Sequence, residues 1–252
     1  MKEQKKYAIS VIAGLLTIIV SSIILFSSGS YAVYTANTIK RKLPVYGVGR
    51  DDGALSISFD CAWGTDYTDK ILDTLDFYNV KATFFVVQFW AEKYPDYLKK
   101  IVGRGHEVGT HSKTHPKMSK LSAEEIEEEL KSSVAAIENV TGQKVKLFRP
   151  PFGDYDDKVI TAAENLGLYT IQWNVDSLDW KNLSAEQIAA RVIKKAGSGS
   201  IILMHNNGRH TAESLPLIFT ATQQKGLVYR PISELIYTDD FRITPDGTQI
   251  KN

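Results

Sequence analysis

The sequence predicts an α/β fold in which a parallel sheet forms a (β/α) barrel of about seven strands. Short apolar runs alternate with amphipathic stretches, which is typical of strands that alternate with helices in a parallel sheet. Six or seven such units follow one another, and that number favours a barrel. Polar residues follow the apolar runs, as they do at the functional edge of such barrels.

The first units lie between residues 54 and 110. Ala54–Phe59 alternates small or polar with large apolar residues, and Lys81–Val87 is mostly apolar, so both are predicted strands. Between them, Thr68–Tyr78 carries apolar residues at helical spacing. Tyr97–Val102 is predicted to be a short helix, and Glu107–Thr110 the end of a strand.

Two helices in the second half carry start signals. Ser122 with Glu125, and Ser184 with Gln187, have the spacing of a capping box. The glutamates among positions 124 to 129 are interpreted as a solvated helix face. The other predicted elements are strands at Lys146–Phe148, Tyr169–Val175, Ser200–Met204 and Leu227–Tyr229, and helices near Asp157–Leu166, Ser184–Lys195 and Ala212–Lys225.

The N-terminus predicts a membrane anchor. Lysine-rich Met1–Lys6 precedes an uncharged, mostly apolar run of about 20 residues from Tyr7 to Phe26, which is long enough to cross ~30 Å of hydrocarbon as a helix. Residues 1–32 are therefore assigned to a cytoplasmic stub and a transmembrane helix, with the rest of this single-pass cell-membrane protein outside the cytoplasm. A cleaved signal peptide, which would give a secreted protein, stays open because Ser30-Tyr31-Ala32 offers small residues at suitable positions.

The rest of the sequence predicts one domain between two flanks. Residues 33–53 are polar and mildly basic, which is typical of a linker, so the domain is assigned to 54–240 and a C-terminal tail to 241–252. The formal net charge is +1 and no basic patch alternates with aromatic residues, so nucleic acid is excluded as a partner. The single cysteine, Cys61, excludes an intramolecular disulfide framework.

His111 and His115 stand four residues apart in Arg104-Gly-His-Glu-Val-Gly-Thr-His-Ser-Lys-Thr-His115. If the chain turns helically after Thr110, both imidazoles lie on one face and can bind one divalent metal ion. Two histidines in a polar loop would give the same pattern, and this alternative stays open on the spacing alone.

Other polar residues follow predicted strands at the same edge. Functional groups gather where the strands of a parallel barrel end, so we expect these residues to share one site. Buried charges are costly unless they are paired, which makes core packing a poor explanation for them. The residues are Asp60, His111 with His115, Arg149, Asp176 with Asp179 and Trp180, and His205.

With these residues, the sequence resembles NodB-type polysaccharide deacetylases, carbohydrate esterase family four, over most of Leu55–Leu235. The family's motifs occur in family order as Ser58-Phe-Asp-Cys-Ala62, His111-Ser-Lys-Thr-His115, Arg149-Pro-Pro-Phe-Gly153, Asp176-Ser-Leu-Asp-Trp180 and Leu203-Met-His205. The resemblance implies a distorted (β/α) barrel and metal-assisted hydrolysis of acetyl groups on the N-acetylated sugars of a polymer. The membrane segment and the Phe-Asp-Cys-Ala-Trp-Gly64 variant resemble the sporulation-associated branch, which implies peptidoglycan as the polymer.

The resemblance also implies roles for individual residues. Asp60 matches the catalytic base and His205 the general acid. Arg149 and Asp176 match the pair that positions and tunes this base, Arg149 by keeping Asp60 ionised and Asp176 by holding the guanidinium. The matched metal ligands, for one divalent ion expected to be Zn²⁺ with Co²⁺ or Mn²⁺ as alternatives, are His111 and His115. The matched substrate-binding positions are Pro151, Phe152, Trp180 and Leu203.

Position 61 departs from the family pattern, which has there a second aspartate that is the third metal ligand. Cys61 could ligate zinc as a thiolate and is kept among the candidate ligands, or it could be a buried, inert small hydrophobe. The sequence thus predicts a membrane-anchored polysaccharide deacetylase. The alternative is a catalytically weak or inactive glycan-binding or scaffold protein of the same fold.

Overall fold

The sheet is built around β2 (Ala54–Cys61), an eight-residue strand that is buried along its whole length. In the computed structural model, which describes residues 41–252, β2 pairs in parallel with β3 (Thr83–Val86) and β8 (Ile201–His205). β4 (Glu107–Thr110), β5 (Leu147–Phe148) and β6 (Tyr169–Thr170) extend the sheet beyond β3, and β7 (Val175–Asp176) lies beyond β8. All neighbouring pairs are parallel, and β9 (Val228–Tyr229) adds a short parallel pairing with β2.

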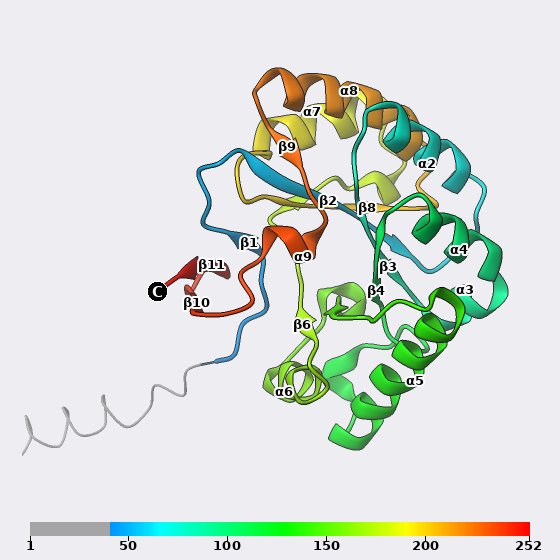
Figure 1. Cartoon of the computed structure of the whole chain (residues 1–252), viewed down its shortest axis with the longest axis vertical. Helices are drawn as coiled ribbons and strands as arrows, with labels where there is room; N and C mark the ends of the chain where they lie inside the picture. The colour runs from blue at the N-terminus through cyan, green and yellow to red at the C-terminus, as the bar shows by residue number, and fades with distance from the viewer. Residues whose placement is uncertain (1–40) are drawn as a thin grey trace, which may run out of the picture. The chain divides into compact units, whose positions relative to one another are not determined.

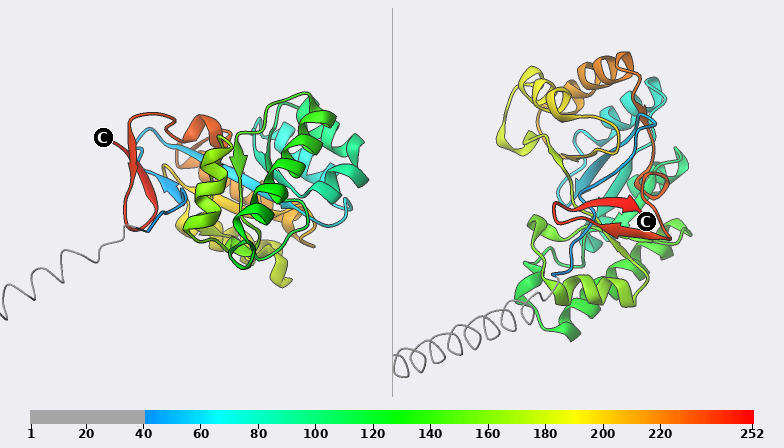
Figure 2. Two further views of the ribbon diagram at one scale, coloured as in Figure 1. Left: turned by 90° about the horizontal axis from the view of Figure 1, so that it is seen from below. Right: turned by 90° about the vertical axis from the view of Figure 1, so that its left-hand side faces the viewer.

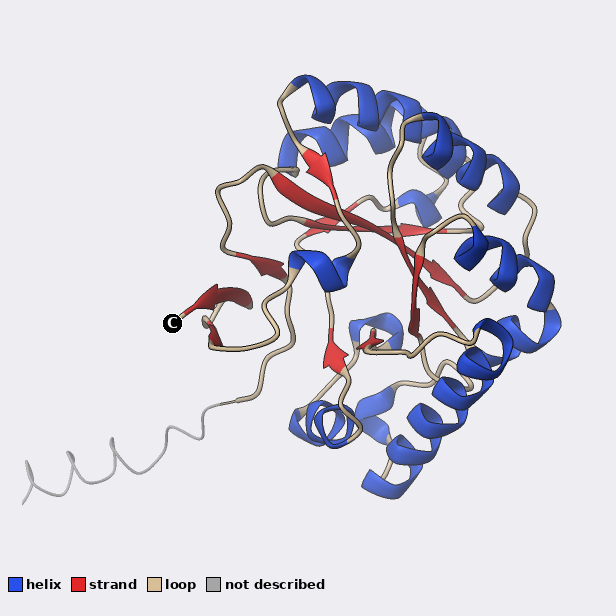
Figure 3. Ribbon diagram, viewed as in Figure 1, coloured by secondary structure: helices blue, strands red, loops and turns tan. Residues whose placement is uncertain are grey.

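Helices line the outer side of this curved sheet (Figures 1 and 3). The strands and the helices between them confirm the predicted α/β class, and the open curved sheet is consistent with a distorted (β/α) barrel. The helices are α2 (Thr68–Phe77), α3 (Gln88–Lys93), α4 (Pro95–Gly103), α5 (Ala123–Thr141), α6 (Asp157–Asn165), α7 (Ala185–Lys195), α8 (Thr211–Gln224) and α9 (Ile232–Leu235).

Local signals account for the starts of α5 and α7 and for the end of α5. Ser122 and Glu125 form a complete capping box at the start of α5, and Ser184 and Gln187 form one at the start of α7, as predicted. α5 ends at Gly142, whose φ of 69° is a left-handed value that glycine adopts without steric cost.

The predicted strand Tyr169–Val175 is instead two strands at opposite ends of the sheet, since β6 pairs with β5 and β7 pairs with β8. The segment around Val45 lies against this open edge: its N–H donates to Thr170 O at 2.9 Å, and its carbonyl accepts from Gln172 N at 2.8 Å. Val45 and Val48 are almost completely buried. Within the segment 33–53 that was assigned to a linker, Val45 and Val48 therefore pack into the domain.

The predicted tail 241–252 forms two strands rather than a loose end. β10 (Phe241–Ile243) pairs antiparallel with β11 (Thr248–Lys251), and β11 pairs in parallel with β1 (Gly47–Val48). Figure 2 shows this small sheet at the periphery of the domain.

None of the helices within residues 41–252 has the length and apolar character needed to cross a bilayer. The predicted anchor, residues 1–32, lies outside the described residues.

Candidate active site

Asp60 lies near the C-terminal end of β2 with its carboxylate paired to Arg149. Arg149 Nη1 donates to Asp60 Oδ1 at 2.8 Å, and Arg149 Nη2 donates to Gln172 O at 3.2 Å. The guanidinium is completely buried, with its central carbon 4.1 Å from the centroid of the Phe85 ring. Burial by itself would raise the pKa of Asp60, but the charge of Arg149 and the hydrogen bond that it donates hold it below its usual range. Asp60 is therefore an ionised carboxylate in a nearly closed site.

Asp176 does not hold the guanidinium of Arg149, so the predicted pairing is wrong. Within residues 41–252, no hydrogen bond or ion pair joins these two side chains. Asp176 Oδ1 instead accepts from Leu178 N at 2.9 Å and shapes the turn after β7. The burial and aromatic contacts of Arg149, rather than a second carboxylate, fix its orientation.

The two histidines of the predicted metal pair lie on a loop after β4, and this loop is not helical. Ser112 and His115 have φ values of 72° and 60°, in the left-handed region that non-glycine residues rarely adopt. The chain therefore does not turn helically after Thr110, yet the two rings converge: their centroids are 4.9 Å apart.

Glu129 holds this loop in place. Its Oε2 accepts from Lys113 N at 2.9 Å and from Thr114 N at 2.8 Å, and its Oε1 accepts from Thr114 Oγ1 at 2.6 Å. Glu129 is buried, so the prediction that all these glutamates form a solvated face is wrong at this position. A carboxylate on α5 satisfies the loop amides that a helix would have satisfied internally.

His111 is oriented as a metal ligand would be. Its Nδ1 lies 2.7 Å from Arg149 O, an acceptor, so Nδ1 carries the proton and Nε2 presents its lone pair. Nε2 lies 3.5 Å from Asp60 Oδ2. Burial lowers the pKa of His111 to about 4, and burial also lowers the pKa of His115. Both rings are therefore neutral at pH 7, the form that binds metals.

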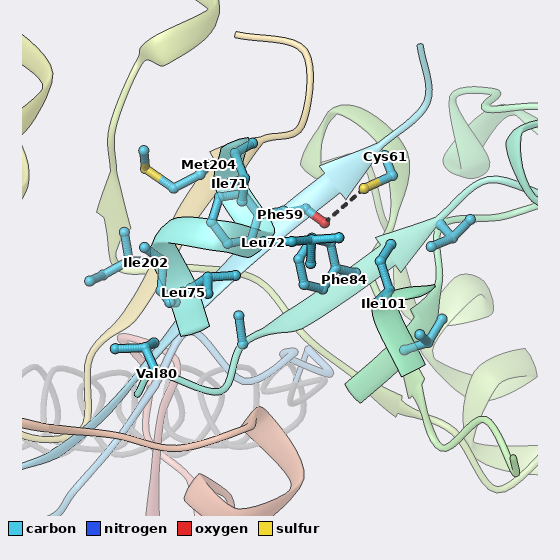
Figure 4. Packing of buried hydrophobic residues seen from close by; sticks show 14 of the residues in the cluster. Phe59, Cys61, Ile71, Leu72, Leu75, Val80, Phe84, Ile101, Ile202 and Met204 are labelled. Atoms are coloured by element: carbon cyan, nitrogen blue, oxygen red, sulfur yellow. Dashed lines mark hydrogen bonds between the residues drawn. The ribbon is translucent and has the colours of Figure 1, made fainter. Parts of the chain in front are cut away.

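Cys61 faces away from the site. Figure 4 shows its side chain among buried apolar residues, with Sγ 3.8 Å from Phe59 O. Adjacent residues of a strand point to opposite faces, so Asp60 facing the site places Cys61 in the core. Burial, followed by the charge of Asp60, raises the pKa of the thiol well above its usual value. The candidate assignment of Cys61 as a ligand is therefore wrong, and the inert alternative holds.

The residues present supply two of the ligands that a divalent ion needs. The neutral imidazoles of His111 and His115 suit such an ion, but catalytic zinc sites commonly use three protein ligands. No group of three or more His, Cys, Asp or Glu side chains that could hold a metal ion occurs in the described part of the chain.

His205 lies beside Asp60, because the two residues are register partners on β8 and β2. Its Nδ1 lies 2.7 Å from Asp179 Oδ1, and its backbone N–H donates to Asp179 Oδ2 at 2.7 Å. Thr211 Oγ1 donates to the same Oδ2 at 2.6 Å. Burial opposes protonation of His205, but the hydrogen bond and charge of Asp179, with smaller contributions from Asp60 and Asp176, raise its pKa.

Asp179 belongs to the predicted strand-end cluster, but no role is predicted for it from the sequence. Its position three residues after Asp176 is a weak signal, because both aspartates follow the same short strand. Burial distinguishes them: Asp179 is 1 % exposed and makes three hydrogen bonds, whereas Asp176 is only partly buried.

The four predicted substrate-binding positions fall into two groups. Phe152 and Trp180 are 66 % and 57 % exposed at the strand-end edge, whereas Pro151 and Leu203 are buried beneath it. Phe152 has a φ of 59° and a ring centroid 4.6 Å from that of His115. A large aromatic side chain held outward by left-handed backbone is typical of a ligand-contacting position.

The fold and the site together define a class of protein, a half-barrel hydrolase. At its strand ends lie a carboxylate, two neutral imidazoles and a further histidine, His205, that is hydrogen-bonded to Asp179. Comparison with known proteins identifies the family within this class. The profile of the polysaccharide deacetylase family matches residues 47–171. The peptidoglycan-N-acetylmuramic acid deacetylase PdaA of Bacillus subtilis is 30 % identical over 212 residues, which cover 82 % of this chain and 81 % of PdaA. The chain belongs to the polysaccharide deacetylases, carbohydrate esterase family four.

Two further similarities bear on activity. The uncharacterized protein YlxY of Bacillus subtilis is 37 % identical over 193 residues, which cover 77 % of this chain and 60 % of YlxY. The chain therefore spans less than two thirds of that relative. The crystal structure of BA3943, a family pseudoenzyme from Bacillus anthracis, superposes with a TM-score of 0.74 at 36 % identity, and the match covers 76 % of this chain and 68 % of BA3943.

Proposed function

We propose that this chain is a polysaccharide N-deacetylase that removes acetyl groups from the N-acetylated sugars of peptidoglycan. One observation carries the proposal: an ionised carboxylate, Asp60, lies beside the neutral His111 and beside His205, whose pKa is raised. Hydrolysis of an amide needs a group that accepts a proton from water and another that donates one to the leaving nitrogen. Family relatives that are named peptidoglycan deacetylases support the choice of polymer.

In the proposed reaction, Asp60 takes a proton from water as the water oxygen adds to the acetyl carbonyl carbon. The carbon–nitrogen bond then breaks as His205 protonates the nitrogen, which leaves acetate and a free amine. Arg149 keeps Asp60 ionised, and Asp179 keeps His205 oriented and protonated. A divalent ion, when bound by His111 and His115, would supply Lewis acidity and a lowered water pKa.

Acetate release tests the proposal. The purified chain is incubated with peptidoglycan fragments and with N-acetylglucosamine oligomers, without metal and with Zn²⁺, Co²⁺ or Mn²⁺. We expect release in at least one metal condition and loss of release in His111→Ala. Absence of acetate under every condition, from a protein that melts cooperatively, would contradict the proposal.

The second candidate function is glycan binding without efficient hydrolysis. The orientation of Cys61 into the core supports it, since the protein then offers fewer metal ligands than the usual set. Similarity to the pseudoenzyme BA3943 supports it as well. Glycan binding without acetate release under any metal would favour this candidate. Glycan binding together with acetate release would favour the first.

We further propose that residues 7–26 anchor the protein, with the catalytic domain on the extracytoplasmic side of the membrane and, by resemblance, a role in sporulation. The uncharged run behind a lysine-rich start supports this topology. Fractionation of cells that express the full chain, followed by protease treatment of intact protoplasts, tests it. Recovery of the intact domain from the cytoplasm would contradict the topology.

A further inference from the structure

Exposed aromatic side chains gather around the strand-end edge. Of the six large hydrophobic side chains that are exposed among residues 41–252, three lie within three positions of a site residue. Trp63 follows Asp60, Phe152 follows Arg149, and Trp180 follows Asp179. Large apolar groups exposed beside a polar site mark ligand-binding grooves. Phe152 and Trp180 are already among the predicted substrate-binding positions, whereas Trp63 is not.

Trp63 is 59 % exposed, yet the chain around it is fixed. The carbonyl of the next residue, Gly64, accepts from Trp90 Nε1 at 2.8 Å and from Asn206 Nδ2 at 2.9 Å. The Trp63 ring centroid lies 5.2 Å from that of Phe89, and the two planes are tilted by 37°. The loop is fixed by hydrogen bonds and the indole packs on a neighbouring ring, so Trp63 is preorganised. Binding of a ligand to it would therefore cost little side-chain conformational entropy.

Trp63 also continues a row of rings over the site. Its centroid lies 6.3 Å from that of His115, and the centroid of His115 lies 4.6 Å from that of Phe152. Trp63 and Phe152 therefore both lie beside His115. A polymer chain that passes over His115 would meet both aromatic side chains with different sugar units.

We propose that Trp63, supported by Phe89, forms an additional sugar-binding subsite for a unit of the glycan next to the unit at Asp60. This inference rests on the proposed function, because it takes the ligand to be an N-acetylated glycan. The faces of a pyranose ring present C–H groups that pack on an aromatic surface, and its hydroxyl edges need polar partners. The indole N–H of Trp63 has no acceptor among the described residues and can donate to such a hydroxyl.

The α3 helix supplies further polar groups at this position. Gln88 and Glu92, on either side of Phe89, form an exposed hydrogen bond of 2.8 Å from Nε2 to Oε1. An apolar platform with a polar rim suits a sugar, which is apolar on its faces and polar at its edges.

Equilibrium binding of peptide-free N-acetylglucosamine oligomers tests the subsite without dependence on catalysis. Calorimetric titrations compare the disaccharide and the pentasaccharide on the parent chain, Trp63→Ala and Trp63→Phe. We expect Trp63→Ala to weaken pentasaccharide binding by about tenfold, since one platform contact is worth roughly 1.4 kcal/mol. Disaccharide binding should weaken in the same direction, because its second unit reaches the subsite next to Asp60, and Trp63→Phe should recover part of the loss.

Phe77→Ala is the matched control, because Phe77 is an aromatic side chain that is 83 % exposed and lies at the end of α2. It should bind both oligomers like the parent. Equal pentasaccharide affinity in Trp63→Ala and the parent would overturn the subsite, as would a parent that binds no oligomer. A parent that binds with the expected Trp63 dependence but releases no acetate would contradict the proposed deacetylation while supporting the subsite.

Discussion

At the scale of single residues, Asp60 and Cys61 divide the end of β2 between two environments. Asp60 contacts the buried Arg149, and the next side chain enters the apolar core. The thiol of Cys61 stays protonated there, because burial and the charge of Asp60 both raise its pKa. Cys61 therefore belongs to the packing of the core, and Asp60 belongs to the site.

Replacing Cys61 by serine tests this assignment. We expect Cys61→Ser to lower the free energy of unfolding by about 1–3 kcal/mol, because a hydroxyl is buried among apolar side chains. Zinc affinity should not change. Urea unfolding and a zinc titration of the same preparation measure both, with Cys61→Ala as a variant that adds no polar group. Lost zinc affinity at unchanged stability would contradict the orientation of the thiol.

The His205–Asp179 pair makes a prediction about pH. His205 must be protonated to act as an acid. Because its pKa is raised in the folded protein, the imidazole stays protonated at pH values above about 6.5, its pKa in the unfolded chain. The basic limb of the rate profile should therefore lie above that value. In Asp179→Asn the amide no longer stabilises the imidazolium, so the limb should move to lower pH.

An NMR titration of His205 gives the same quantity without catalysis. Since the folded pKa is raised, the pair stabilises the fold fully below about pH 6.5, and this stabilisation is lost as pH rises through the folded pKa. Asp179→Asn should therefore reduce stability more at pH 5.5 than at pH 9, by the linkage between pKa and folding. Identical His205 titrations in the two proteins would contradict the role of Asp179.

At the scale of elements, the loop after β4 depends on a helix that begins later in the chain. We expect Glu129→Ala to weaken zinc binding by about 10–100-fold, the range for residues that support metal ligands, because three donors of the loop lose their acceptor. Alanine keeps α5 helical. Glu128→Ala is the control, since Glu128 pairs only with the exposed Lys113 Nζ. Equal affinity in both variants would contradict the supporting role.

The sequence predicts those elements whose signals are local. Ser122 with Glu125 predicts the start of α5, and the apolar run before Asp60 predicts β2, because a cap and a burial pattern act over a few residues. The shape of the histidine loop could not be predicted, because its amides at Lys113 and Thr114 are satisfied by Glu129, which lies on a later helix. Similarly, which of two aspartates supports His205 depends on the packing of β7 against β8, which spacing does not encode.

At the scale of the whole domain, the sheet is not closed by its own strands. β6 and β7 lie at its two ends, and chain segments near the N- and C-terminal ends of the domain pair with each other beside this opening. Buried Val45 packs in one cluster with Ile171 and Ile201. The N-terminal flank was predicted as a linker because two buried valines in a polar stretch give no periodic pattern.

Gln249 joins the small sheet to the domain. It is fully buried, its Nε2 donates to Tyr237 O at 2.7 Å, and its Oε1 accepts from Tyr237 N at 2.8 Å. We expect Gln249→Ala to lower the free energy of unfolding by about 1–3 kcal/mol, because both backbone groups lose a partner. Arg242→Ala, at an exposed position of β10, should have little effect. Equal urea midpoints for the two variants would contradict this anchoring.

The role of Asp60 as the base is tested most directly by the rate at which Asp60→Asn releases acetate from N-acetylglucosamine oligomers at saturating metal. Asparagine keeps the shape of the side chain but cannot accept the proton of water, so we expect a loss of about 10²–10⁴-fold with metal still bound. Asp66→Asn, at an exposed position six residues along the chain, should retain the parent rate. An Asp60→Asn rate equal to that of Asp66→Asn would contradict the assignment of Asp60 as the base.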